Sequence, residues 1–147
     1  MASKPGQVPA ARSPGHELVD HTSEITLRIR APTYSGLVSE ATRAFSELVP
    51  ASLRGRVSRD HREFRIEGVD GTALLVHWLN EIVYLCEVEH WLPIEVDLVE
   101  RNGSALHVRA KGVALEGPFV LVKAATLHRA AIEEGPEGLV AEVTLDV

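Results

Sequence analysis

Residues 94–110, IEVDLVERNGSALHVRA, decide the fold class that the sequence predicts. Apolar and polar residues alternate at 94–100 and again at 105–110, and a period of two is typical of a half-buried β-strand. Between the two runs stands Arg101-Asn102-Gly103-Ser104, and Asn-Gly in that position is the strongest short signal for a β-hairpin. The stretch therefore predicts two antiparallel strands joined by a tight turn.

Further strands are expected on both sides of this hairpin. Downstream, 120–132 and 139–147 are predicted strands, with glycine and proline marking the turn between them. Upstream, EITLRIR at 24–30 alternates strictly. A short strand at 64–67 follows a basic stretch, 51–62, which we interpret as a solvated loop rather than a phosphate-binding surface. This succession of hairpins favours antiparallel pairing.

Two amphipathic helices complete the pattern. Apolar residues recur at helical spacing over 34–49, with Thr33 as N-cap and Pro50 at the end, and over 72–88, with Asp70 as N-cap. The side chains expected in the core include Phe45, Trp78, Leu79 and Ile82. Because two helices cannot cover both faces of so many strands, the sequence predicts an α+β fold, with two helices packed on a mixed, mainly antiparallel sheet.

Composition limits the organisation and the partners of the chain. Its 147 residues, 45% hydrophobic and 24% charged, indicate one globular domain at 16–147, preceded by a flexible tail at 1–15. A net charge of −6 excludes a general nucleic-acid binder, so RNA would be contacted through a partner or a local basic surface, and we expect only indirect contact. The single cysteine, Cys86, fits a reducing cytoplasm and is interpreted as a core residue. No run approaches the roughly 18 apolar residues of a membrane span, so no membrane association is expected.

The motifs of many small enzymes do not occur in this sequence. It has no phosphate-binding G-x-x-x-x-G-K-[ST] loop, no dinucleotide-binding glycine pattern and no C-x-x-C pair. It also has no G-x-S-x-G nucleophile elbow. The commonest reasons for a small domain to turn over a substrate are therefore missing.

Two polar clusters inside the chain remain as candidate sites. In DHTSE, residues 20–24, Asp20 or Glu24 could hold a cation, or the polar groups could bond the backbone of a local turn. In KAATLH, residues 123–128, regular alternation would put Thr126 and His128 on one strand face. That pair could contact an anion, orient a metal ligand or simply face solvent.

A third cluster is the chain end, Asp146-Val147. It closes an alternating strand. If the strand holds the Asp146 side chain close to the carboxylate of the chain end, the two negative charges would repel unless a cation neutralised them. Hard cations prefer such oxygen ligands. The alternative is a solvated tail whose charges are spread apart, which needs no metal.

Taken together, these segments resemble the archease family over nearly all of 17–147. Archeases begin with a His-Thr-Ala-Asp-Ile-like segment, carry an apolar helix of similar pattern, contain a Lys-Ala-x-Thr-x-His strand, and end in Asp followed by Ile or Val. The matching residues here are His21-Thr22-Ser23-Glu24-Ile25, Trp78-Leu79-Asn80-Glu81, Lys123, Ala124, Thr126 and His128, and Asp146-Val147. All four segments occur in the family's order and at its separations.

The resemblance implies nested strand-helix-strand-strand modules and a chaperone-like accessory role rather than catalysis. It implies a divalent cation, calcium, magnesium or manganese, held by Glu24, Asp146 and Val147. It also implies activation of the RNA-splicing ligase that joins tRNA halves, by promoting its guanylylation and multiple turnover. Residues that would support the metal site are Asp20, His21, Lys123, Thr126 and His128.

The sequence departs from the family pattern at two of these places. Glu24 stands where archeases usually have Asp, and Arg129 stands where they often have Asp. The longer Glu side chain has more rotamers to fix, which would shift or weaken the site. Two alternatives stay open from the residues alone. One is a small metal-dependent hydrolase with His21 or His128 as base. The other is a ligand-binding or interaction domain that holds no metal.

Overall fold

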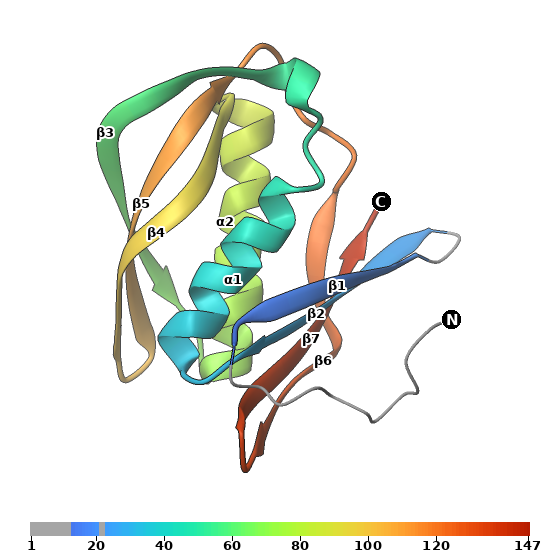
Figure 1. Cartoon of the computed structure of the whole chain (residues 1–147), viewed down its shortest axis with the longest axis vertical. Coiled ribbons are helices and arrows are strands. Elements are labelled where there is room, and N and C mark those ends of the chain that lie inside the picture. The colour runs from blue at the N-terminus through green and yellow to red at the C-terminus, as the bar shows by residue number, and fades with distance from the viewer. Residues whose placement is uncertain (1–12, 21–22) are drawn as a thin grey trace.

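The computed structural model describes residues 13–20 and 23–147, and its strands form two sheets (Figure 1). One sheet, sheet A, has the order β1-β2-β7-β6, and the other, sheet B, has the order β3-β5-β4. Every strand pair described is antiparallel. In chain order the elements are β1 (Gly15–Asp20), β2 (Glu24–Ala31), α1 (Tyr34–Ser46), a 3-10 turn (Ala51–Leu53), β3 (Arg54–Glu67), α2 (Gly71–Val88), β4 (Trp91–Asn102), β5 (Ala105–Leu115), β6 (Ala124–Gly135) and β7 (Gly138–Asp146).

The chain is organised as one strand-helix-strand-strand unit inside another. The outer unit is β2-α1-β6-β7, and the inserted unit is β3-α2-β4-β5. Both units have the same strand order, in which the third strand lies between the first and the second. The expected nesting is therefore found, and β1 is an addition at the edge of sheet A.

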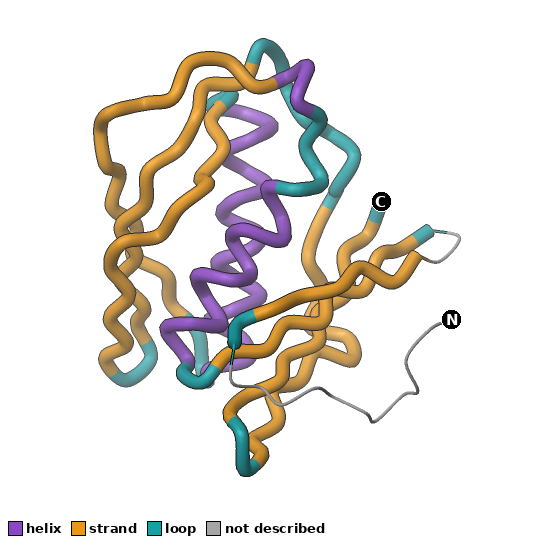
Figure 2. Tube along the Cα trace, in the orientation of Figure 1, coloured by secondary structure: helices purple, strands orange, loops and turns teal. Residues whose placement is uncertain are grey.

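Both helices lie between the two sheets, where they form the core (Figure 2). Helix α1 contacts β2 of sheet A and β4 of sheet B, and helix α2 contacts β6 as well as sheet B. The side chains predicted to be buried, Phe45, Trp78, Leu79 and Ile82, are completely inaccessible to solvent. The predicted α+β class, with two helices on antiparallel strands, is confirmed.

The hairpin that decided the fold class is present, with its turn shifted by one residue. Asn102 is the last residue of β4 and pairs with Ala105, so that the turn consists of Gly103 and Ser104. Gly103 has φ +64°. A glycine with positive φ at the first turn position is typical of a type II′ turn, which matches the twist of the flanking strands.

The two predicted helix caps are also confirmed. The Thr33 hydroxyl accepts a hydrogen bond from the Gly36 N–H at 3.0 Å. The Asp70 carboxylate accepts one from the Ala73 N–H at 2.8 Å. Each cap satisfies an N–H group that has no partner within its own helix.

The strand predictions need three corrections. Strand β3 starts at Arg54, inside the stretch interpreted as a solvated loop, because exposed polar residues there pair with β5 despite two register shifts. Strand β1 was not predicted, because GHELVD at 15–20 contains no alternating apolar run. The predicted strand at 120–132 begins only at Ala124. The predicted tail lies mostly outside the described residues.

A buried polar contact between the two helices gives a test of the core. The Trp78 Nε1–H donates to the Thr42 hydroxyl at 2.9 Å, and that hydroxyl donates to the Val38 carbonyl at 2.8 Å. Thr42→Val should lower the free energy of unfolding by about 1–3 kcal/mol, because it leaves the indole N–H buried without an acceptor. Thr42→Ser keeps the acceptor and should cost less. Urea denaturation measures both, and equal stability of the two variants would contradict this contact.

Candidate functional site

The pairing of β2 with β7 places Glu24 directly opposite Asp146. Directly opposed residues of antiparallel strands have Cβ atoms about 4.5–5.5 Å apart and point to the same face of the sheet. The first residue of β2 and the last residue of β7 therefore present two carboxylates side by side. Ala124, the first residue of β6, pairs with Asp146 on its other side and extends the row.

The two carboxylates lie on the face of sheet A that points away from the helices. Their neighbours in sequence, Ile25 and Leu145, also pair with each other and join the core instead. Asp146 is exposed, whereas Glu24 is half-buried. The alternation of side chains along each strand thus puts the apolar residues inside and the acidic pair at the outer surface.

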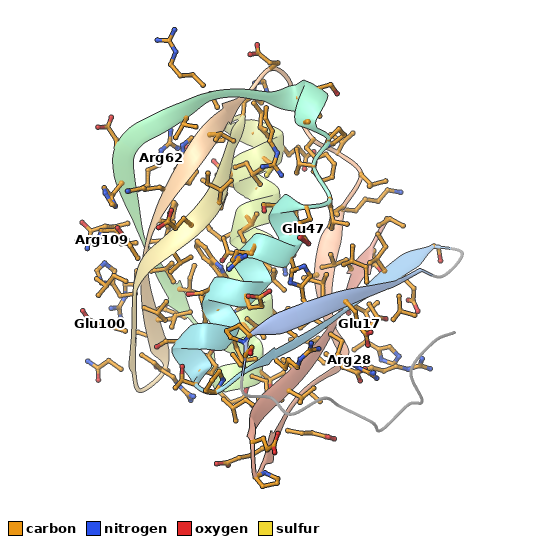
Figure 3. All side chains as sticks on the ribbon, in the orientation of Figure 1. Glu17, Arg28, Glu47, Arg62, Glu100 and Arg109 are labelled. Atoms are coloured by element: carbon orange, nitrogen blue, oxygen red, sulfur yellow. The ribbon has the colours of Figure 1, made fainter. Side chains whose placement is uncertain are left out.

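Charge in the middle of this outer face is balanced by ion pairs. Arg28 contacts Glu142 at 2.8 Å. It also contacts Glu17 at 3.1 Å, and Figure 3 labels both of these residues. A row of hydroxyls, Thr26, Thr144 and Thr126, follows towards the acidic end. Within the described part of the chain, the carboxylates of Glu24 and Asp146 have no hydrogen-bond or ion-pair partner. Two adjacent carboxylates without a counter-charge are a donor set that suits a hard cation.

Main-chain hydrogen bonds hold the end of β7 from both sides. The Val147 N–H donates to the Ser23 carbonyl at 3.1 Å, and the Lys123 N–H donates to the Asp146 carbonyl at 2.8 Å. Residues 146 and 147 are therefore fixed in position beside the start of β2. Lys123 contributes a backbone contact at this end of the sheet, and its side chain is exposed.

Asn80 of helix α2 fixes the start of β6. Its side-chain amide donates to the Ala125 carbonyl at 2.9 Å and its oxygen accepts from the Ala125 N–H at 2.8 Å. The amide thus occupies both backbone groups of a residue on the edge strand, as a neighbouring strand would. In the sequence, Asn80 stood out only as part of the archease-like segment Trp78-Leu79-Asn80-Glu81.

Strand β6 is irregular directly after Thr126. After the pair Thr126–Thr144, the next paired residues are Ala131 and Glu142, so β6 has extra unpaired residues in between. Arg129, one of these residues, has φ +61°. This bulge interrupts the alternation from which Thr126 and His128 were predicted to share a face. The structure shows instead that the His128 N–H donates to the Thr126 hydroxyl at 3.1 Å, with the His128 side chain exposed.

The other predicted ligands are placed as follows. Asp20 ends β1 opposite Ile25, so its backbone lies one position away from the acidic pair. His21 lies outside the described residues. Among the residues that are described, no group of three or more His, Cys, Asp or Glu side chains converges as a metal site would. The candidate donors at this position are therefore the two carboxylates and an oxygen of Val147.

Cys86, His61 and His107, which could also be reactive, are buried or paired with a carboxylate in this structure. Burial raises the pKa of the Cys86 thiol to about 12, so that it is protonated and not nucleophilic at neutral pH. His61 contacts the Asp97 carboxylate at 2.6 Å, and His107 contacts that of Glu63 at 2.8 Å.

None of the helices in the described residues is long and apolar enough to cross a membrane.

Comparison with known proteins gives a consistent family assignment. Residues 16–147 match the model of the Archease protein family. The chain is 28% identical to the protein archease of Archaeoglobus fulgidus, over 90% of this chain and 98% of that protein. It is also 28% identical to the protein archease of Methanopyrus kandleri, over 89% and 98%. The probable protein archease of Mycobacterium tuberculosis is 27% identical over all of this chain and 80% of its own length.

Two solved structures have the same fold. The solution structure of Methanobacterium thermoautotrophicum protein 1598 has a TM-score of 0.67 at 21% identity, covering 90% of this chain and 99% of that one. The crystal structure of a Thermotoga maritima archease, described as a possible chaperone, has a TM-score of 0.61 at 21% identity, covering 88% and 94%. At this identity the likeness shows the fold alone.

The role of Asn80 can be tested with an isosteric change. In Asn80→Asp, the carboxylate still accepts from the Ala125 N–H but cannot donate to the Ala125 carbonyl, and the two oxygens repel. We expect the free energy of unfolding to fall by about 1–3 kcal/mol, with faster amide exchange at the start of β6. Glu81→Gln, at the next position, removes no hydrogen bond to β6 and serves as control. If both variants exchange at the wild-type rate, Asn80 does not fix this strand.

Proposed function

The chain belongs to the archease family, and on this basis we propose that it is a metal-binding accessory protein that activates an RNA-splicing ligase. It would do so by promoting the guanylylation and multiple turnover of that enzyme. The single observation that supports a metal site is the pairing of Glu24 with Asp146, without a counter-charge in the described residues. The description of the T. maritima archease as a possible chaperone fits an accessory role.

The donors suit calcium, magnesium or manganese. The carboxylates of Glu24 and Asp146, together with an oxygen of Val147, would hold the ion, since hard cations prefer oxygen ligands. A bound cation would supply positive charge at this end of sheet A and relieve the repulsion between the two carboxylates. The backbone contacts of Ser23 and Lys123 would keep the donors in place.

The surroundings of the acidic pair suit binding to a partner. Asp146 and Lys123 are exposed, and the bulge of β6 exposes Leu127, His128 and Arg129 on the same strand. The ligase would therefore meet both the ion and a mixed apolar and basic segment at this end of the sheet. RNA would be reached only through the ligase, because the whole chain carries a net charge of −6.

Metal binding can be measured directly by calorimetric titration with calcium, magnesium and manganese. Asp146→Asn removes one negative donor without changing its size and should weaken binding at least about tenfold. Without metal, the same change should leave the thermal midpoint equal or higher, because it removes a repulsion. Glu24→Asp restores the usual archease residue and should bind as tightly or more tightly.

Glu142→Gln is the matched control for this titration. Glu142 lies on the same face of β7 but pairs with Arg28, so its loss should cost little metal affinity. Wild-type affinity in Asp146→Asn would exclude this site. Absence of binding to the wild-type chain would exclude the metal from the proposal.

Activation of the ligase needs its own measurement. Purified ligase, GTP, a divalent metal and RNA halves would be incubated with substoichiometric amounts of this chain, and the ligations per ligase molecule counted. We expect several turnovers with the wild-type chain, fewer with Asp146→Asn, and no ligation by the chain alone. Equal turnover with and without the chain would contradict an activating role, whatever its metal affinity.

A further inference from the structure

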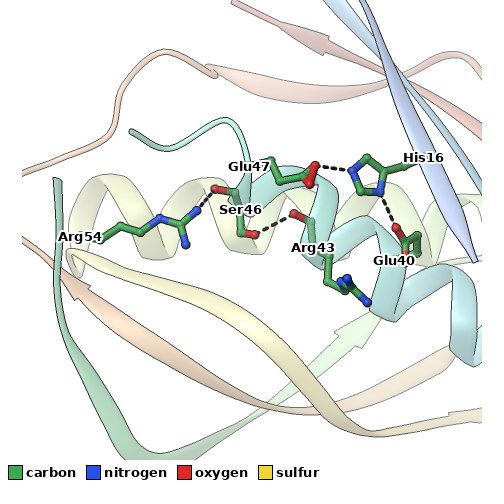
Figure 4. A network of polar contacts seen from close by, with 6 residues as sticks. All are labelled: His16, Glu40, Arg43, Ser46, Glu47 and Arg54. Atoms are coloured by element: carbon green, nitrogen blue, oxygen red, sulfur yellow. Dashed lines mark hydrogen bonds and ion pairs between the residues drawn. The ribbon is translucent and has the colours of Figure 1, made fainter. Parts of the chain in front are cut away.

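A single histidine joins strand β1 to helix α1. The two ring nitrogens of His16 contact different carboxylates, Nδ1 that of Glu40 and Nε2 that of Glu47 (Figure 4). The two glutamates are about two turns apart on the same face of the helix, and the imidazole lies between them. This cluster is on the helix side of sheet A, away from the acidic pair at the end of β7.

Both contacts can be hydrogen bonds only if the imidazole is protonated. A neutral imidazole has one N–H, whereas the imidazolium has two and can donate to both carboxylates at once. The Glu40 side chain is only 6% exposed, and the donor that the structure gives it is His16. Loss of the proton would leave one ring lone pair facing a carboxylate, and a buried charge without its donor is costly.

Strand β1 has few other attachments. It is an edge strand that pairs with β2 and, among the described elements, also packs against α1. Its apolar residues contribute little, because Leu18 is 42% exposed and Val19 is 39% exposed. Short edge segments with few buried contacts open at a small free-energy cost, so one ionic contact can decide whether β1 stays in place.

We propose that His16 is a pH-sensitive latch that holds β1 on helix α1 only while its imidazole is protonated. At alkaline pH the latch opens, β1 separates, and the edge of β2 becomes available for pairing. This inference is independent of metal binding and of the ligase. It concerns a contact that no feature of the sequence pattern indicated.

The groups around His16 set the direction of the pH dependence. Burial lowers the pKa of His16, but the hydrogen bonds and negative charges of Glu40 and Glu47 outweigh it, and the pKa lies above its ordinary value of 6.5. On β2, the neighbouring cation Arg30 lies over Gly15. Because the pKa is raised in the closed state, the stabilisation is complete below the ordinary pKa and is lost as the pH rises through the raised one.

The test is amide hydrogen exchange of the whole chain between about pH 6 and pH 9, corrected for the intrinsic effect of pH. Protection of β1 should fall with rising pH, by about tenfold for each unit by which the pKa of His16 exceeds that of the released strand. Protection of β7, which pairs on the other side of β2, is the internal reference. A flat profile for β1 in the wild-type chain would overturn the latch.

Variants separate the latch from general destabilisation. Glu47→Gln removes one charge, so the midpoint should move to lower pH. His16→Ala should leave β1 open at all pH values while β7 stays protected. His107→Gln, which removes a histidine paired with exposed Glu63 on sheet B, should change nothing in β1. An unmoved midpoint in Glu47→Gln, or a pH dependence that persists in His16→Ala, would show that His16 is not the latch.

Discussion

The register between β2 and β7 is the constraint on which the arrangement depends. Leu27 and Ile29 pair with Val143 and Ala141, and all four are buried against the helices. A slip by one residue would turn these apolar side chains to solvent and the charged ones into the core. Burial therefore fixes the register, and the register in turn places Glu24 opposite Asp146. The position of the acidic pair follows from apolar packing several residues away.

The same alternation explains how sheet A carries charge at little cost. Arg28 on its outer face is shared by Glu17 and Glu142, so charge in the middle of the sheet is balanced locally. At the end of the sheet, the carboxylates of Glu24 and Asp146 form no ion pair within the described chain. Water reaches the exposed Asp146 side chain and makes this arrangement tolerable, and the same access would admit an ion.

Local patterns predicted the elements that have a strong period or a cap. The helices and the β4–β5 hairpin follow directly from apolar spacing, from Thr33 and Asp70 and from Gly103. The strands β1 and the first part of β3 could not be found in this way, because edge strands exposed to solvent do not need an alternating apolar face.

In the candidate site, too, local patterns identified some residues and missed those whose role depends on contacts between distant elements. The residues alone marked Glu24 and Asp146-Val147 as separate candidates. Only the family resemblance combined them into one site, because spacing along the chain contains no information on which strands pair. Asn80 and His16 depend on contacts between elements distant in sequence. A single polar residue on a helix, or a histidine within a strand that was not predicted, gives no signal of such a contact.

The nested topology also has a consequence for the order of folding. The inserted unit contains the β4–β5 hairpin, and its longest strand pairing, Arg54 with Leu115, joins residues only 61 positions apart (115 − 54). Sheet A can close only when β2 finds β7, and the Arg28–Glu142 contact joins residues 114 positions apart. Since closing a long loop costs more entropy than closing a short one, the inner unit should form early and the outer sheet late. The acidic pair would then be among the last features of the native state to assemble.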